Sequence, residues 1–309
     1  MGTPRRPTGA SPDIYVQIPA YRDAELPKTL LDLYARASTP RRLRVCVMWQ
    51  HGARERLPTS VRSLPRLEII EVPYQASRGC NWARNTLQRR WNGEPFTLLL
   101  DSHHRFVRGW DTALMRMYRG LRDQGCAKPI ITGYLPAYQP SWDPGGRKKE
   151  PYRIYPHGRE RGVLTRLISF PIQDWKSLKK PVEADFASLH FLFAPGVFNE
   201  EIRFDPGIYF FGDEVVTSVR AFTHGYDLFH PHIVLGWHSF DRASRVPHWK
   251  DHDGWHRQHE RSLELMRRLY RGEYEGPFGV GHCRSVREYE AHVLLTLAEE
   301  SGEETRRAG

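Results

Sequence analysis

The 309-residue sequence has few cysteines and none in a CxxC pair. Its four thiols, at Cys46, Cys80, Cys126 and Cys283, are widely spaced, which excludes a small disulfide-stapled scaffold and a cysteine-based zinc site of the usual spacing. Free thiols of this kind are typical of a reducing compartment. We therefore expect a cytoplasmic protein with unpaired cysteines.

Long apolar runs and glycine-rich nucleotide motifs are also missing. No stretch reaches the roughly 18 apolar residues that a transmembrane helix needs. No GxGxxG follows the first expected strand, and no GxxxxGK[ST] occurs anywhere. These absences argue against a membrane-spanning protein, a dinucleotide enzyme of the Rossmann type and a P-loop NTPase.

The two ends of the chain lack the patterning of a folded core. Residues 1–12 are rich in Pro, Gly, Arg and Ser and contain no apolar segment, so we interpret them as a disordered leader and not a secretory signal. Residues 293–309 are expected to be the end of a helix and a polar tail. The length between them suits one large α/β domain, 13–292.

A net charge of +10 indicates an anionic partner without identifying it. Nucleic acid, a nucleotide and an acidic peptide all remain open on this ground. A nucleic-acid-binding protein is the alternative from a different functional class. Against it, the basic residues are scattered and no known nucleic-acid-binding motif is present.

Short apolar runs alternate with helical patterns through the first half of the chain, which predicts a mostly parallel sheet covered by helices. Ligands of such sheets collect beyond the carboxyl ends of the strands. Regular patterning stops over 138–185, where we expect an irregular segment, either a functional loop or a disordered one. Strands are expected at 14–18, 43–49, 67–72, 96–100 and 129–134, with helices at 26–37, 81–91, 110–124 and 256–272.

The fourth expected strand ends in Asp101, and His103 follows two residues later. Side chains at positions i and i+2 of an extended chain point the same way, so the two can share one divalent ion. Carboxylate oxygen with imidazole nitrogen suits manganese well, and zinc or magnesium less specifically. A polar loop after a strand is the alternative interpretation of the same residues.

Charged residues on both sides of this pair fit an anionic ligand. Arg78 and Arg84 precede the strand and are expected near phosphates, with Asn85 as a hydrogen-bond partner of a ribose or sugar hydroxyl. Asp213 and Glu214 follow a glycine further along. They also suit the first turn of a helix, where the dipole favours negative charge.

Several motifs in order resemble the polypeptide α-N-acetylglucosaminyltransferase family, whose best-known members modify hydroxyproline on the Skp1 protein. They are QIPAYRD, LLLDSHHRF, FFGDE, RAFTHGYDLFHP, GWH and GVGHCRSVREYE, and they extend from about residue 13 to 292. A more distant similarity is to the polypeptide GalNAc-transferases, which carry the same Asp-Ser-His and a later metal-binding histidine. Asp213 stands where the family pattern has glutamate.

This resemblance implies a GT-A fold of class α/β, with a nucleotide-binding half over 13–134 and an acceptor half with a lid over 135–292. It implies a UDP-sugar donor, Mn²⁺ or Mg²⁺, and retention at the anomeric carbon. By the resemblance, Asp101, His103 and His238 are the metal ligands, and Asp213 and Glu214 face the donor sugar as catalytic residues. The donor-binding residues that it and the flanking sequence suggest are Pro19, Ala20, Tyr21, Arg22, Arg78, Trp82, Arg84, Asn85, Ser102, Arg242, Arg245 and Trp249.

The function that the sequence favours is therefore transfer of a sugar from a UDP-sugar to a hydroxyl group of a peptide or protein. GlcNAc is the favoured sugar. The same chemistry on a small molecule or peptide natural product is the alternative within enzymes. A catalytically inactive sugar-binding module is a third possibility, and the complete set of Asp101, His103 and His238 speaks against it. We expect no membrane partner.

Overall fold

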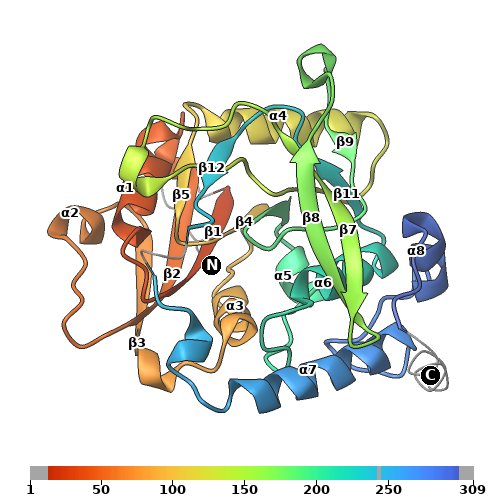
Figure 1. Cartoon of the computed structure of the whole chain (residues 1–309). Coiled ribbons are helices and arrows are strands. Elements are labelled where there is room, and N and C mark those ends of the chain that lie inside the picture. The colour runs from red at the N-terminus through yellow and green to blue at the C-terminus, as the bar shows by residue number, and fades with distance from the viewer. Residues whose placement is uncertain (1–12, 242–244, 299–309) are drawn as a thin grey trace, which may run out of the picture.

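A central sheet of eight strands runs through the protein, which the computed structural model describes over residues 13–241 and 245–298 (Figure 1). The strand order is β3-β2-β1-β4-β10-β6-β11-β9. Its members are β1 (Ile14–Tyr21), β2 (Leu43–His51), β3 (Leu67–Pro73), β4 (Phe96–Leu100), β6 (Pro129–Thr132), β9 (Val182–Glu183), β10 (Phe191–Pro195) and β11 (Asp227–His230).

The expected parallel half of this sheet is confirmed. β1 pairs in parallel with both β2 and β4, and β2 pairs in parallel with β3. The second half is mixed, because β10 runs antiparallel to β4 and β6 while β6 and β11 are parallel. All four strands of the first half therefore present their carboxyl ends at the same edge, as a ligand site of an α/β sheet requires.

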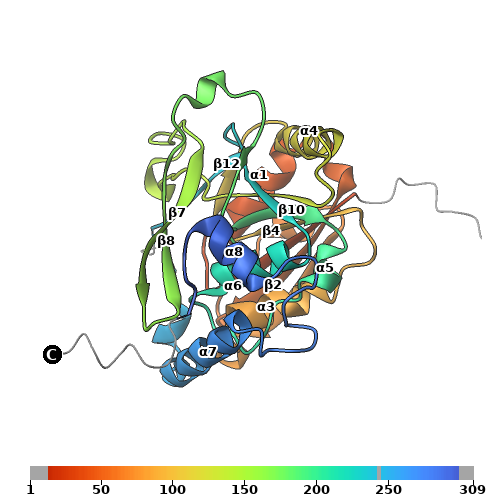
Figure 2. The ribbon, with the colours of Figure 1, turned by 90° about the vertical axis from the view of Figure 1, so that its right-hand side faces the viewer.

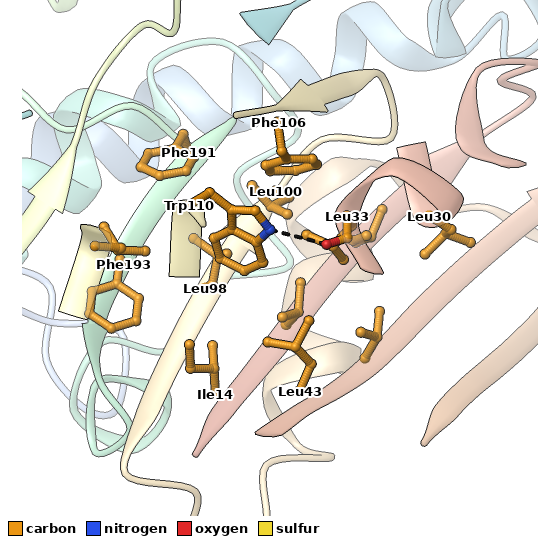
Figure 3. Packing of buried hydrophobic residues seen from close by; sticks show 14 of the residues in the cluster. Ile14, Leu30, Leu33, Leu43, Leu98, Leu100, Phe106, Trp110, Phe191 and Phe193 are labelled. Atoms are coloured by element: carbon orange, nitrogen blue, oxygen red, sulfur yellow. Dashed lines mark hydrogen bonds between the residues drawn. The ribbon is translucent and has the colours of Figure 1, made fainter. Parts of the chain in front are cut away.

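Helices cover both faces of the sheet because the buried strands carry apolar side chains on both sides. Ile14, Val16 and Ile18 of β1 belong to a cluster with α1 (Leu26–Arg36) and α4 (Trp110–Asp123). The alternate residue Tyr15 packs on the other face against α3 (Cys80–Gln88). Figure 3 shows the first cluster, in which the Trp110 indole Nε1 donates to the Leu33 carbonyl over 3.0 Å.

The helices α2, α5 and α6 add to the covering of the sheet. α2 (Thr59–Arg62) contributes Val61 to the cluster with α1 and α4. Beside β10, α5 (Phe198–Glu201) and α6 (Asp213–Thr223) pack on the same side as α3. α6 also contacts α8 (Val286–Val293).

A small antiparallel ribbon lies at the carboxyl edge of the main sheet. It consists of β5 (His104–Phe106) and β12 (Gly236–His238). Three residues, Asp101–His103, separate the end of β4 from the start of β5, so the chain makes only a short excursion at Asp101 before it enters the ribbon. This ribbon brings a late segment of the chain back to the end of β4.

The prediction of irregular structure across 138–185 was wrong in its middle. β7 (Tyr152–Glu160) and β8 (Leu164–Pro171) form a second antiparallel ribbon, which stands beside α6 and above α7 (Trp255–Tyr270) (Figures 1 and 2). The register of the ribbon is irregular between Pro156 and Arg159. A proline, a glycine and this bulge interrupt the period-two pattern that reveals strands in a sequence.

Other expectations concern the ends of elements and of the chain. The helix expected at 81–91 ends at Gln88, and the strand expected at 129–134 ends at Thr132. The expected leader and most of the expected tail, 1–12 and 299–309, lie outside the described residues. None of the helices in the described ranges has the length and apolar character needed to cross a membrane. The four cysteines are unpaired, as expected.

Candidate active site

Three side chains from two distant segments meet at the carboxyl end of β4. Asp101 is the first residue after the strand, and its backbone N–H is held by the His190 carbonyl, 3.2 Å away. His238 is the last residue of β12, which the ribbon register places directly opposite His104. The end of the late strand thereby arrives beside the pair Asp101 and His103.

The spacing of these three side chains suits a shared divalent ion. The Asp101 Oδ2 atom lies 3.3 Å from the Nε2 atom of His238 and 3.6 Å from that of His103. One ligand atom from each of the three residues lies within 4.8 Å of the other two. Both imidazoles are buried, whereas 26% of the Asp101 side chain is exposed, so the group opens toward solvent on its carboxylate side.

His103 has a second partner behind it. Its Nδ1 atom lies 2.6 Å from Oδ2 of Asp23, a buried residue just after β1. The Ser102 hydroxyl donates to the same carboxylate oxygen over 2.6 Å. The interaction fixes the ring orientation and, with Nδ1–H as the donor, leaves the lone pair on Nε2.

Two more buried histidines surround His238. The His190 ring stacks on it, with centroids 4.0 Å apart and planes 14° from parallel. The His104 ring is 4.9 Å from that of His238, and the His104 Nδ1 atom lies 3.0 Å from the Asp101 carbonyl. The His104 Nε2 and His238 Nδ1 atoms are both buried without a protein partner. With its Nδ1–H donating to the Asp101 carbonyl, the His104 ring keeps Nε2 as a buried acceptor.

Burial keeps these rings neutral. It lowers the pKa of His104 to about 3 and holds the pKa values of His190 and His238 well below the ordinary value, with further lowering from neighbouring histidines. Burial alone would raise the pKa of Asp101, but the electrostatic influence of His103 and Arg84 outweighs it and holds that pKa below its usual value. The site therefore offers a carboxylate beside the neutral imidazoles of His104, His190 and His238.

Arg245 lies at one side of the cluster formed by Asp101, His103 and His238. Its guanidinium contacts the His103 Nε2 atom, and its backbone bridges to Asp23. Arg242, also expected to bind the sugar donor, lies outside the described residues. Arg245 lines two cavities that meet at Asp101.

The first cavity lies over the ends of β1 and β2 and has an empty volume of about 840 Å³, open solvent included. Of the expected donor-binding residues, it is lined by Pro19, Tyr21, Ser102, Arg245 and Trp249. The segment expected as a lid forms part of its wall through Arg245–Trp249.

A hydrogen-bonded chain supports the wall of the first cavity. Tyr209 donates to Nδ1 of His248 over 2.6 Å, and the His248 Nε2 atom lies 2.9 Å from the Ser77 hydroxyl. That hydroxyl in turn donates to Gln50 Oε1 over 2.5 Å. The wall is thereby connected from β2 to the 3-10 helix η5 (His248–Lys250).

The second cavity contains the acidic pair. Asp213 and Glu214 begin α6 after Gly212, whose φ of 88° is a conformation that glycine adopts at low cost. Arg84 lies in the same wall and binds Asp213 Oδ2 through Nη1 over 2.5 Å. The expected acidic pair and Arg84 are thus brought together with Asp101 and His238 around one space.

Glu214 is held by neutral donors. The Tyr134 hydroxyl lies 2.5 Å from Oε2, and the Leu189 backbone N–H donates to Oε1 over 3.0 Å. Burial and the neighbouring Asp213 raise the pKa of Glu214 to about 7, and burial also raises the pKa of Asp213. A carboxyl group of this kind titrates near neutral pH.

Five of the expected donor-binding residues lie outside both cavity walls. Ala20 is buried in the core against α1, and Asn85 donates to the Phe204 carbonyl over 2.8 Å. Arg22 pairs with Asp251 over 2.9 Å. Arg78 is exposed, with its guanidinium 6.0 Å from the centre of the half-buried Trp82 ring.

Sequence reasoning missed the residues that support the ligand group. Asp23 closes the QIPAYRD motif and His104 is the second histidine of DSHHRF, so both stood inside motifs already quoted. His190 carries no local signal. Its place depends on the start of β10, which only the fold brings beside β12.

Comparison with known proteins bears on the fold and the family. The family model described as "Glycosyltransferase (GlcNAc)" matches residues 13–66 and 59–299. No curated protein matches the sequence at a significant level. The structure of GalNAc-T7 with UDP, GalNAc and Mn²⁺ is similar at a TM-score of 0.58 and 11% identity, covering 93% of this chain and 55% of that one.

A second similar structure is that of Staphylococcus aureus TarS 1–349 in complex with UDP-GlcNAc, with a TM-score of 0.48 and 13% identity. The match covers 77% of this chain and 60% of that one. The chain thus spans about half to three fifths of the length of these two proteins.

The structural likeness to GalNAc-T7 concerns the fold alone, since so low an identity transfers no activity. It agrees with the GT-A fold expected from the sequence: a mostly parallel sheet between helices, with an antiparallel strand where its two halves join. The family match covers nearly all of the described chain, from its first strand to beyond its last helix. The chain therefore belongs to the GlcNAc glycosyltransferase family.

Proposed function

We propose that the chain is a retaining, metal-dependent glycosyltransferase that moves a sugar from a UDP-sugar to a hydroxyl group of a peptide or protein. GlcNAc is the sugar that we propose. The observation that carries this proposal is the convergence of Asp101, His103 and His238 at the point where two cavities meet. The solved complex of GalNAc-T7 with UDP, GalNAc and Mn²⁺ supports it by its shared fold. The kinship with Skp1-modifying enzymes is part of the proposal.

The proposed metal ligands Asp101, His103 and His238 fit Mn²⁺, with Mg²⁺ as the alternative, because one carboxylate and two imidazoles suit a borderline cation. The hydrogen bonds support the same assignment. Asp23 accepts a hydrogen bond from the Nδ1–H of His103. His104 donates through Nδ1 to the Asp101 carbonyl, which leaves its Nε2 as a buried acceptor, and a water bound there would accept from the Nδ1–H of His238. Each ring then presents its Nε2 lone pair toward Asp101, as metal-binding histidines require.

Arg245 is proposed to change partner when the donor binds. Its guanidinium contacts the His103 nitrogen that is assigned to the ion, so the two cannot occupy the position together. A diphosphate is a strong partner for guanidinium and would draw the side chain away. Its backbone bridge to Asp23 keeps it at the site during this exchange.

The two cavities suggest where the parts of the donor lie. The uridine fits the first cavity, whose walls include Tyr21, Tyr209 and Trp249, because aromatic rings stack on bases. The sugar fits the second cavity, beside Asp213 and Glu214. When bound, the ion would neutralise the charge that develops on the departing diphosphate.

Glu214 is proposed to accept a hydrogen bond from a sugar hydroxyl. A buried carboxylate discriminates epimers, because the wrong epimer leaves it without a partner. Asp213 is neutralised by Arg84 and helps to hold the wall. In a front-face reaction the leaving phosphate takes the acceptor proton, so no side chain is assigned as the base.

The division of the domain follows from these assignments. Residues 13–134 supply most of the first cavity, and the acceptor half with the lid, 135–292, supplies most of the second. The lid assignment rests on Arg245 and Trp249, which line the first cavity from a segment that begins just after His238.

A donor screen tests the proposal without knowledge of the acceptor. The protein is incubated with Mn²⁺ and individual nucleotide-sugars, and nucleotide release by slow hydrolysis is measured. We expect UDP release from UDP-GlcNAc above that from UDP-glucose, and its loss when the metal is chelated. Release that is equal in chelator, or confined to another nucleotide, would overturn the assignment.

A further inference from the structure

The β7–β8 ribbon turns one of its faces away from the rest of the protein (Figure 2). Its inner residues Ile154 and Leu167 pack with α6 and α7. On the other face, Tyr155 lies opposite Ile168, and Arg153 lies opposite Phe170. Tyr155 is 39% exposed and Phe170 is 53% exposed, with their ring centres 6.0 Å apart. An aromatic surface thus faces outward.

The chain after β8 converts this surface into a groove. On its way to β9 it places Ile172, Leu178 and Val182 along the same pocket as Tyr155 and Phe170. The resulting groove is mainly apolar and open to solvent. Its mainly apolar lining suits one or two apolar side chains of an extended segment.

Basic groups border the groove. The Arg153 guanidinium lies 5.6 Å from the centre of the Tyr155 ring, and its contact with Asp185 is a long one of 3.5 Å. His157 lies on the wall, and Lys176 and Lys179 are exposed in the segment that closes the groove. Among the described residues that line it, none is acidic. The charge around the apolar surface therefore complements a carboxylate.

One strand connects this groove with the candidate active site. Leu164, Thr165, Arg166 and Leu167 at the start of β8 line the cavity that holds the acidic pair. Ile168 and Phe170, further along the same strand, line the groove. From Arg166 to Phe170 the strand advances about 13 Å, at roughly 3.3 Å per residue. An extended polypeptide covers this distance in four or five residues.

We propose that this groove binds the acceptor polypeptide. An extended segment lies along β8, places an aromatic or aliphatic side chain next to a carboxylate in the groove, and brings a hydroxyl four to five residues away to the cavity. The inference rests on the proposed transfer to a hydroxyl of a peptide or protein. It adds the class of acceptor sequence that the enzyme selects.

Charge and length argue for this occupant over three others. A second copy of this chain carries the same net charge of +10 and would be repelled by the basic border. A nucleic acid would need a row of cations along its phosphates, whereas the centre of this groove is apolar. A small-molecule acceptor would not extend from the cavity to Phe170.

The test compares the wild-type protein with the double variant Tyr155→Ser/Phe170→Ser. Both side chains are exposed, so the fold should persist, and a thermal melt checks this. Leu294→Ser is the matched control, because Leu294 is 87% exposed and lines neither cavity nor groove. The probe is a library of peptides with one central threonine and random flanks. Peptides that bind to the immobilised protein are collected first. They are then incubated with the protein, UDP-GlcNAc and Mn²⁺, and the peptides that gain the mass of the sugar are identified.

We expect the selected peptides to carry an aromatic or large aliphatic residue beside Asp or Glu, four or five positions from the threonine. The double variant should bind such peptides about tenfold more weakly, as expected when an aromatic anchor loses its contact. The control should bind as the wild type does. UDP release in the absence of peptide should be the same in all three proteins.

The outcomes separate this inference from the function on which it rests. Normal UDP release with no enriched flanking residue, or enrichment that the double variant retains, would overturn the groove assignment and leave the transferase proposal standing. Absent UDP release with intact, groove-dependent peptide selection would overturn the donor assignment alone.

Discussion

His238 lies directly opposite His104 across the antiparallel pair of β5 and β12, and His104 directly follows the Asp101–His103 segment that leaves β4. The register of a three-residue ribbon therefore sets the position of the proposed third ligand. A shift by one residue would point Trp237 toward the group in its place. Backbone hydrogen bonds at both ends of the ribbon hold this register, from the Ser239 N–H to the His103 carbonyl over 3.0 Å and from the Val107 N–H to the Leu235 carbonyl over 3.1 Å.

Replacement of His238 by alanine should lower Mn²⁺ affinity by about a hundredfold, because a site with three protein ligands loses one of them. UDP binding should weaken only when metal is present. Calorimetry of UDP with Mn²⁺ and with chelator measures both effects. Trp237→Phe is the control, since its ring packs under the Arg147 guanidinium, 4.4 Å away. Unchanged Mn²⁺ affinity in His238→Ala would exclude the residue as a ligand.

His104 should matter through its Nε2 acceptor. His104→Phe keeps the ring volume and removes the acceptor, so we expect Mn²⁺ affinity to fall about tenfold or more, as for other outer partners of metal ligands. His104→Gln retains an oxygen near that position and should recover most of the affinity. Electron paramagnetic resonance of bound Mn²⁺ measures this without turnover. If the two variants bind Mn²⁺ equally, the ring serves packing and does not orient His238.

Arg84 should contribute to stability through Asp213. Arg84→Ala leaves a buried carboxylate without its partner, which costs about 3–5 kcal/mol in comparable sites. The double variant Arg84→Ala/Asp213→Ala should be less destabilised than Arg84→Ala alone. Urea denaturation gives both values, and the exposed Arg78→Ala should change stability by less than about 0.5 kcal/mol. Additive losses in the double variant would show that the pair is not coupled.

Glu214 should make stability depend on pH between about 4.5 and 7. Its folded pKa, about 7, is raised above the unfolded value, so the folded state keeps a proton that the unfolded state releases. Stability is therefore lost as the pH rises through this window. Glu214→Gln removes the titrating group. The free energy of unfolding of the variant minus that of the wild type should therefore increase by up to a few kcal/mol from pH 4.5 to 8. A flat difference in urea midpoints over this range would place the pKa of Glu214 at its ordinary value.

Local sequence signals were sufficient for the first half of the fold. The run Phe96–Leu100 is apolar on both faces and stops at a charged residue, so both the strand and its end were predicted. The alternation of strands and helices likewise predicted the parallel pairing of β1, β2 and β4. In these segments, burial on both faces leaves a pattern that does not depend on distant parts of the chain.

The remaining features depend on contacts between distant segments. The β7–β8 ribbon is half exposed and interrupted by Pro156 and Gly158, so its strands do not show a clear period. Arg84 was expected near phosphate, but whether a buried guanidinium binds a ligand or a carboxylate depends on Asp213, 129 residues away. The place of Asn85 against the Phe204 carbonyl is likewise set by a segment 119 residues later.

The ribbon of β5 and β12 also has a consequence for how the protein is made. Asp101 and His238 are 137 positions apart, so a chain emerging from the ribosome completes β1, β2 and β4 long before the last proposed ligand has been synthesised. Closing a loop of this length comes late in folding. Metal affinity would then be acquired in one of the final steps, and a protein truncated before β12 would keep its first strands without holding the ion.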